Sequence, residues 1–194
     1  MAYINVPEGV PGIRSLAMFR PETGKLLYEL AQVLLRSDSP LTEAQRELIA
    51  AYVSSRNQCG FCMNSHAAAA RCLYGEDRAL VDQVLADVQK AAVTEKMKAL
   101  LNIAGKVQIL GSAVTEADIG AAREQGADDR EIHDTVLIAA AFSMFNRYVD
   151  GLGSWTPTDP AAYEEMGRRM AKGYVPPQPA GNQAQPAAPH DGSN

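Results

Sequence analysis

The sequence predicts an all-α fold: a compact bundle of several helices with one long apolar helix at its centre. Period-2 alternation of β-branched residues is almost absent, while Ala, Leu, Glu, Gln and Arg, which favour helices, are abundant. Glycine and proline divide the chain into segments of helical length. With 194 residues, 46% of them apolar, the chain is long enough to bury a full hydrophobic core.

Residues that favour helix starts and stops set the expected boundaries in the first half of the chain. Pro21 suits a first helical position, and Glu22 is an acid in the same first turn. Thr42 and Gln45 have the spacing of a capping box. Gly75 is suited to ending a helix. These signals predict helices over residues 13–19, 21–36, 43–56 and 60–73.

The second half contains the longest expected helix, over residues 129–150. It would be about 32 Å long at 1.5 Å per residue. Its middle, 136–145, is apolar on nearly every face, so it is expected to lie centrally or under a partner subunit, and we expect a homo-oligomer. The other helices in this half are expected over residues 77–89, 94–107, 115–125 and 159–172. Residues 1–174 are expected to form a single helical domain, and the Pro/Ala/Gln-rich residues 175–194 a disordered tail.

Charge and hydropathy exclude several classes of function. The formal net charge is −5 and no Lys/Arg cluster stands out, so no nucleic-acid partner is expected. The first residues lack a basic region and an apolar region, so no secretory signal is expected. The longest apolar run, 136–142, is far too short to cross a bilayer. We therefore expect a cytoplasmic protein without membrane contact, in a compartment where disulfides are usually transient and catalytic.

The residues that carry chemistry are two cysteines, a histidine and an upstream acid. Cys62 and His66 are four residues apart, so on one helix they share a face and could exchange a proton. Cys59 falls just before or within the first helical turn, where unpaired N–H groups and the helix dipole favour a thiolate. A Cys-x-x-Cys pair can also close a disulfide, which allows a sulfenic acid to be resolved within one site.

Glu47 is the candidate third member of this group. The residues three, four and seven positions after it, Ala50, Ala51 and Ser54, are all small, so a second helix can approach its carboxylate closely. Glu47 could then orient His66 or accept its proton, as a third group often does behind a nucleophile and its base. We expect loss of either residue to raise the pH at which the reactive cysteine is alkylated.

Other interpretations of the same residues exist. Cys59, Cys62 and His66 could be three ligands of a structural zinc, although a fourth ligand is missing because Cys72 lies off their face. The two cysteines and the histidine could also be ordinary core residues. A thioredoxin-like site is disfavoured because no βαβ pattern surrounds the pair. Cys72 itself is expected to be a packing or surface residue.

The spacing Glu47-x11-Cys59-x-x-Cys62-x3-His66 resembles the active-site signature of the alkylhydroperoxidase D family, within the wider carboxymuconolactone decarboxylase-like group. Residues 46–50 match this signature as well. Residues 6–12 and 145–153 resemble the peroxidase-related branch of the group, so the resemblance covers roughly residues 4–157. One departure is Phe61, which stands where the founding type has a histidine directly before the second cysteine.

The resemblance implies an all-α homo-oligomer that reduces organic hydroperoxides or hydrogen peroxide without a cofactor or metal. Cys62 would attack the peroxide, Cys59 would resolve it, and His66 with Glu47 would relay protons. The electron donor would be an external dithiol, such as a lipoylated or thioredoxin-like protein. Two rival functions remain: a lyase like the lactone decarboxylases, which would not need the thiols, and a redox sensor or disulfide oxidoreductase.

Overall fold

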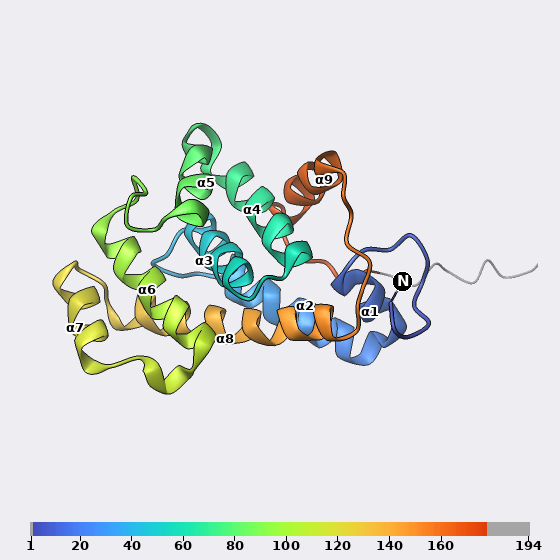
Figure 1. The fold of residues 1–194 in the computed structure, drawn as a ribbon, viewed down its shortest axis with the longest axis horizontal. Helices are drawn as coiled ribbons and strands as arrows, with labels where there is room; N and C mark the ends of the chain where they lie inside the picture. The colour runs from blue at the N-terminus through green and yellow to red at the C-terminus, as the bar shows by residue number, and fades with distance from the viewer. Residues whose placement is uncertain (1, 178–194) are drawn as a thin grey trace, which may run out of the picture.

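Nine α-helices and two short 3-10 turns form the regular structure of residues 2–177, the part of the chain that the computed structural model describes (Figure 1). This part contains no β-strand, so the all-α prediction is confirmed. The helices are α1 (Ile13–Phe19), α2 (Pro21–Arg36), α3 (Glu43–Arg56), α4 (Gly60–Tyr74), α5 (Ala79–Ala86), α6 (Glu95–Ile109), α7 (Glu116–Glu124), α8 (Asp129–Gly151) and α9 (Pro160–Met170). Most of the expected tail, residues 178–194, lies outside the described residues.

The predicted helix boundaries hold where capping chemistry supports them. The Thr42 hydroxyl accepts a hydrogen bond from the backbone N–H of Gln45, while the Gln45 side chain accepts one from the N–H of Thr42. Gly75 ends α4 with a positive φ of 60°, which glycine adopts without steric cost. Capping residues therefore fix the helix ends on either side of the α3–α4 pair.

The prediction of one continuous helix over 77–89 is wrong. A 3-10 turn over Gly75–Arg78 precedes α5, which ends at Ala86. Asp87 leaves the helical conformation with φ −162°, and its carboxylate accepts a hydrogen bond from the N–H of Gln89. Such a local side-chain bond competes with helix continuation, which explains why the helix stops early.

Helix packing places α3 and α4 at the middle of the bundle. They pack against each other; α8 lies against α3 and α6, and α9 packs against α4. In Figure 1, α9 lies beside α4 and α8 runs along the other side of the α3–α4 pair. The pairing of α3 with α4 brings the acid of one helix near the cysteines and histidine of the other.

The long helix α8 is buried along one side only. Ile138, Phe142 and Val149 are fully or almost fully buried, whereas Leu137 and Met144 are 40% and 46% exposed. The expectation that this helix lies centrally or under a partner subunit therefore stays a prediction. None of the helices in residues 2–177 combines the length and hydropathy needed to cross a bilayer.

A glycine lets α9 approach α4 closely. A Cβ atom added at Gly167 would lie 2.6 Å from the backbone carbonyl carbon of Ala68, too close for any side chain. Met166, the neighbour of Gly167, is buried in the same small apolar cluster as Cys59 and Cys62. The contact at Gly167 thus determines how tightly α9 covers the cysteines.

We expect Gly167→Ala to lower the free energy of unfolding by about 1–3 kcal/mol, because the added methyl must push α9 away from the α4 backbone. Gly120 is the matched control. It lies within α7 and a Cβ there meets open space, so Gly120→Ala should raise stability by about 0.5–1 kcal/mol. Urea unfolding of both variants measures the difference. Equal effects of the two substitutions would contradict the close-packing argument.

Candidate functional site

The turn between α3 and α4 positions the two cysteines. Gln58 adopts a φ of +60°, which is uncommon for a residue other than glycine, and the N–H of Cys59 donates to the carbonyl of Ser54 at 3.0 Å. Cys59 is the residue directly before α4, and Cys62 lies in its first turn. Both are buried and both are free thiols.

Hydrogen bonds among three amide side chains, of which only Asn146 is buried, support this turn. The Asn57 amide donates to the Asn146 side-chain oxygen at 2.9 Å, and the Asn146 amide donates to the Ser54 hydroxyl at 3.0 Å. Gln108 adds a hydrogen bond to Asn57 at 2.8 Å. Asn146 therefore ties α8 to the end of α3.

The environment of Cys59 differs from the sequence expectation. A hydrogen bond with Cys62, and then burial, raise the pKa of the Cys59 thiol above its ordinary value. The neighbouring thiol and burial therefore oppose the thiolate that the helix start was expected to favour at Cys59.

His66 is held by Glu47. The His66 Nδ1 atom lies 2.7 Å from the Oε2 atom of Glu47, and the Glu47 side chain is fully buried. An ionised carboxylate accepts the Nδ1–H, which leaves Nε2 as the basic nitrogen of the neutral ring. The structure thus brings together the acid and the histidine that the sequence suggested.

Two residues missed by the sequence analysis complete the surroundings of Glu47. The Arg36 Nη2 atom lies 2.5 Å from Glu47 Oε1, and the Tyr174 hydroxyl donates to the same oxygen at 2.6 Å. Burial alone would raise the pKa of Glu47, but the charge and hydrogen bond of His66, followed by Arg36 and Tyr174, hold it below its usual value. Glu47 is therefore ionised at neutral pH.

Tyr174 also lies beside the imidazole ring of His66. Its ring lies nearly parallel to the His66 ring, with centroids 6.2 Å apart, while Phe142 meets the same ring edge-on at 4.5 Å. Burial and the charge of Glu47 raise the pKa of Tyr174 well above 10, so its hydroxyl stays protonated. No spacing pattern pointed to Tyr174, because it lies far along the chain from Glu47 and follows the last helix.

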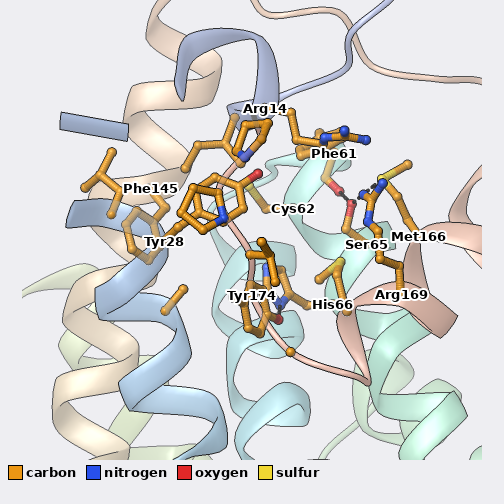
Figure 2. A pocket seen from close by; sticks show the side chains of 18 of the residues that line it. Arg14, Tyr28, Phe61, Cys62, Ser65, His66, Phe145, Met166, Arg169 and Tyr174 are labelled. Atoms are coloured by element: carbon orange, nitrogen blue, oxygen red, sulfur yellow. Dashed lines mark hydrogen bonds between the residues drawn. The ribbon is translucent and has the colours of Figure 1, made fainter. Parts of the chain in front are cut away.

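An apolar cavity of about 330 Å³ adjoins these residues (Figure 2). Cys62 and His66 both line it, whereas Cys59 does not. Figure 2 shows Cys62, Ser65 and His66 along α4, with Tyr174 beside His66. A molecule in the cavity would therefore meet the Cys62 sulfur and the imidazole, but not Cys59.

Two alternatives can be compared with this geometry. Within residues 2–177, no group of three or more His, Cys, Asp or Glu side chains is arranged to hold a metal ion. Cys72 is exposed, as expected, and lies in a separate groove between α4 and α9. Two of the four candidate residues, Cys62 and His66, line one cavity. Cys59 is buried next to Cys62, and Glu47 is hydrogen-bonded to His66.

Comparison with known proteins agrees with this arrangement. The family model of the carboxymuconolactone decarboxylase family matches residues 21–106, which include Glu47, Cys59, Cys62 and His66. No curated protein matches the chain.

Solved structures extend the likeness over most of the chain. An alkylhydroperoxidase AhpD core protein from Ralstonia eutropha JMP134, described as an uncharacterized peroxidase-related protein, is 30% identical, with 82% of each chain covered and a TM-score of 0.72. An uncharacterized peroxidase-related protein from Silicibacter sp. TM1040 is 27% identical, with 82% of this chain and 81% of that chain covered and a TM-score of 0.72. A protein of unknown function from Agrobacterium tumefaciens, associated with AhpD antioxidant defence, shares the fold at 22% identity, with 82% of this chain and 100% of that chain covered and a TM-score of 0.66. The chain belongs to the AhpD-like group of the carboxymuconolactone decarboxylase family.

Proposed function

We propose that the protein is a thiol-dependent peroxidase that reduces organic hydroperoxides or hydrogen peroxide. The observation that carries the proposal is the different placement of the two thiols: Cys62 lines the cavity with His66, whereas Cys59 does not line it and is fully buried in the same apolar cluster as Cys62. An attacking thiol needs access to substrate, whereas a resolving thiol needs access only to its partner.

The first half of the proposed reaction oxidises Cys62. The Cys62 thiolate attacks the outer peroxide oxygen, an S–O bond forms and the O–O bond breaks. The alkoxide leaves and takes a proton from the His66 imidazolium, which had received it from the Cys62 thiol. The products are an alcohol and a sulfenic acid on Cys62. Glu47 fixes the His66 tautomer so that Nε2 handles this proton.

The second half returns the protein to its dithiol state. The Cys59 sulfur attacks the Cys62 sulfur, an S–S bond forms, and the hydroxyl leaves as water with the Cys59 proton. An external dithiol, such as a lipoylated or thioredoxin-like protein, then reduces the disulfide and is itself oxidised to a disulfide. This cycle suits the cytoplasm, where thiols are kept reduced.

A lyase of the lactone decarboxylase type is the second candidate function. The cavity contains cationic side chains, Arg14 and Arg169, that could bind an anionic substrate, and His66 could act as its acid or base. The thiols would then be dispensable, so blocking both cysteines by alkylation would leave such an activity intact. A disulfide oxidoreductase or redox sensor would share the disulfide step but would not consume peroxide.

We expect Cys62→Ser to abolish peroxide-dependent oxidation of a supplied dithiol, because a serine hydroxyl is not ionised near neutral pH and cannot form the disulfide. The assay follows peroxide loss and dithiol oxidation together. Cys72→Ser is the matched control: this exposed cysteine lies away from the cavity, and its loss should leave the rate unchanged. Full activity in Cys62→Ser would contradict the mechanism.

We also propose that α8 contributes to a homo-oligomer contact. Leu137, Ala140 and Met144 follow a helical spacing of three and four residues and are all exposed, which gives α8 an outward apolar stripe. At about 25 cal/mol per Å² of apolar surface removed from water, covering such a stripe favours association.

Replacing Leu137 and Met144 together by glutamate should shift the protein to a monomer of about 21 kDa in sedimentation velocity, because two charges would have to be buried at the contact. The unmodified protein should sediment as a larger species at micromolar concentration. A single monomeric species of the unmodified protein would remove this proposal.

A further inference from the structure

Cationic side chains meet in the same cavity as the thiol. Arg14 of α1 and Arg169 of α9 line it, and Lys172 lies among its lining residues just after α9. In residues 2–177, none of these three forms an ion pair with a carboxylate, although Arg168, next to Arg169, pairs with Glu164. Arg14 is half-buried, whereas Arg169 and Lys172 are exposed to solvent, so all three side chains are available to an anion that enters the cavity.

The two guanidinium groups are close enough to repel each other. Partial burial, followed by the positive charge of Arg14, lowers the pKa of Arg169. Both arginines also act electrostatically on Tyr28, whose pKa is raised by burial to about 12, so its hydroxyl remains protonated. Figure 2 labels Arg14, Tyr28 and Arg169 around the cavity that Cys62 and His66 line. Two like charges and a hydroxyl donor around one space favour an anion between them.

Much of the remaining lining is apolar. Ile13, Leu27, Phe142 and Phe145 supply hydrocarbon surface in the cavity that also contains the arginines and His66. A volume of about 330 Å³ suits a small organic molecule. The cavity therefore combines a place for a charged end with apolar walls.

We infer that the cavity binds an apolar hydroperoxide that carries a carboxylate, with the carboxylate held by Arg14, Arg169 and Tyr28 and the peroxide group at Cys62. The inference rests on the proposed peroxidase function and narrows its substrate to carboxylic acid hydroperoxides. Arginine suits this role because its planar fork matches the two oxygens of a carboxylate. The reaction at sulfur is the one given above, and the carboxylate only anchors the substrate.

The first experiment compares two hydroperoxides that differ only in charge. Cumene hydroperoxide bearing a ring carboxylate and its methyl ester present the same reacting group. The unmodified protein should reduce the acid with a kcat/KM about tenfold higher than the ester, the effect expected for one good charged contact. Arg14→Gln and Arg169→Gln should each bring the ratio of kcat/KM for the acid to kcat/KM for the ester close to one. Arg168→Gln is the matched control and should keep the preference, since Arg168 does not line the cavity.

The rate with the ester shows whether each variant is folded and active. Loss of the carboxylate-binding site can therefore be distinguished from misfolding. Equal rates for acid and ester in the unmodified protein would overturn the inference while leaving the peroxidase function standing. If Arg14→Gln and Arg169→Gln both keep the higher kcat/KM for the acid, the inference is overturned as well.

The second experiment does not depend on peroxidase activity. Iodoacetate is anionic and iodoacetamide is neutral, and both alkylate thiols. In a Cys72→Ser background, the rate of Cys62 alkylation by iodoacetate divided by the rate for iodoacetamide should be higher than the same ratio for a free small thiol. This ratio should fall in Arg14→Gln and in Arg169→Gln. Added salt should lower the ratio, because it screens the cations. If no peroxide is reduced but this ratio behaves as expected, the proposed function fails and the anion subsite stands; a ratio equal to that of the free thiol overturns the subsite.

Discussion

The buried carboxylate of Glu47 is the constraint on which the site depends. Its side chain is inaccessible to solvent, and a lone charge in such a position would be strongly disfavoured. Three partners from different parts of the chain stabilise it: Arg36 at the end of α2, His66 on α4, and Tyr174 after α9. Removing one partner of a buried ion pair costs about 3–5 kcal/mol, so the carboxylate locks these segments together as well as orienting the histidine.

The chemistry follows from this arrangement. Because Glu47 occupies Nδ1 of His66, the imidazole is left with one basic nitrogen, Nε2, and the ring lines the cavity together with Cys62. The α3–α4 turn sets Cys59 away from the cavity, where the neighbouring thiol and burial raise its pKa. The fold thus gives two chemically identical side chains different environments, which is the condition for assigning them different roles in one redox cycle.

Local patterns predicted most of the helices and the four central residues. Capping residues placed the ends of α3 and α4, and helical spacing placed Cys62 and His66 on one face. The small residues after Glu47 correctly indicated that α4 could approach it. Arg36, Tyr174, Arg14 and Arg169 were not predicted, because they reach the site only through contacts between segments far apart in the chain. The sequence shows the helix start at Cys59 but not the neighbouring thiol and the burial that oppose a thiolate there.

The most direct measurement is the pH dependence of alkylation at Cys62 in a Cys72→Ser background, compared with the same protein carrying His66→Gln, Glu47→Gln or both. If Glu47 acts through His66, both single variants should shift the alkylation midpoint to higher pH, with the smaller shift for Glu47→Gln. The double variant should then match His66→Gln alone, because residues acting in series are not additive. Circular dichroism checks that each variant is folded. If Glu47→Gln does not fold, the shift of the alkylation midpoint in His66→Gln alone tests the role of the imidazole. No shift in any variant, or strictly additive shifts, would contradict the relay and leave Glu47 as a structural acid.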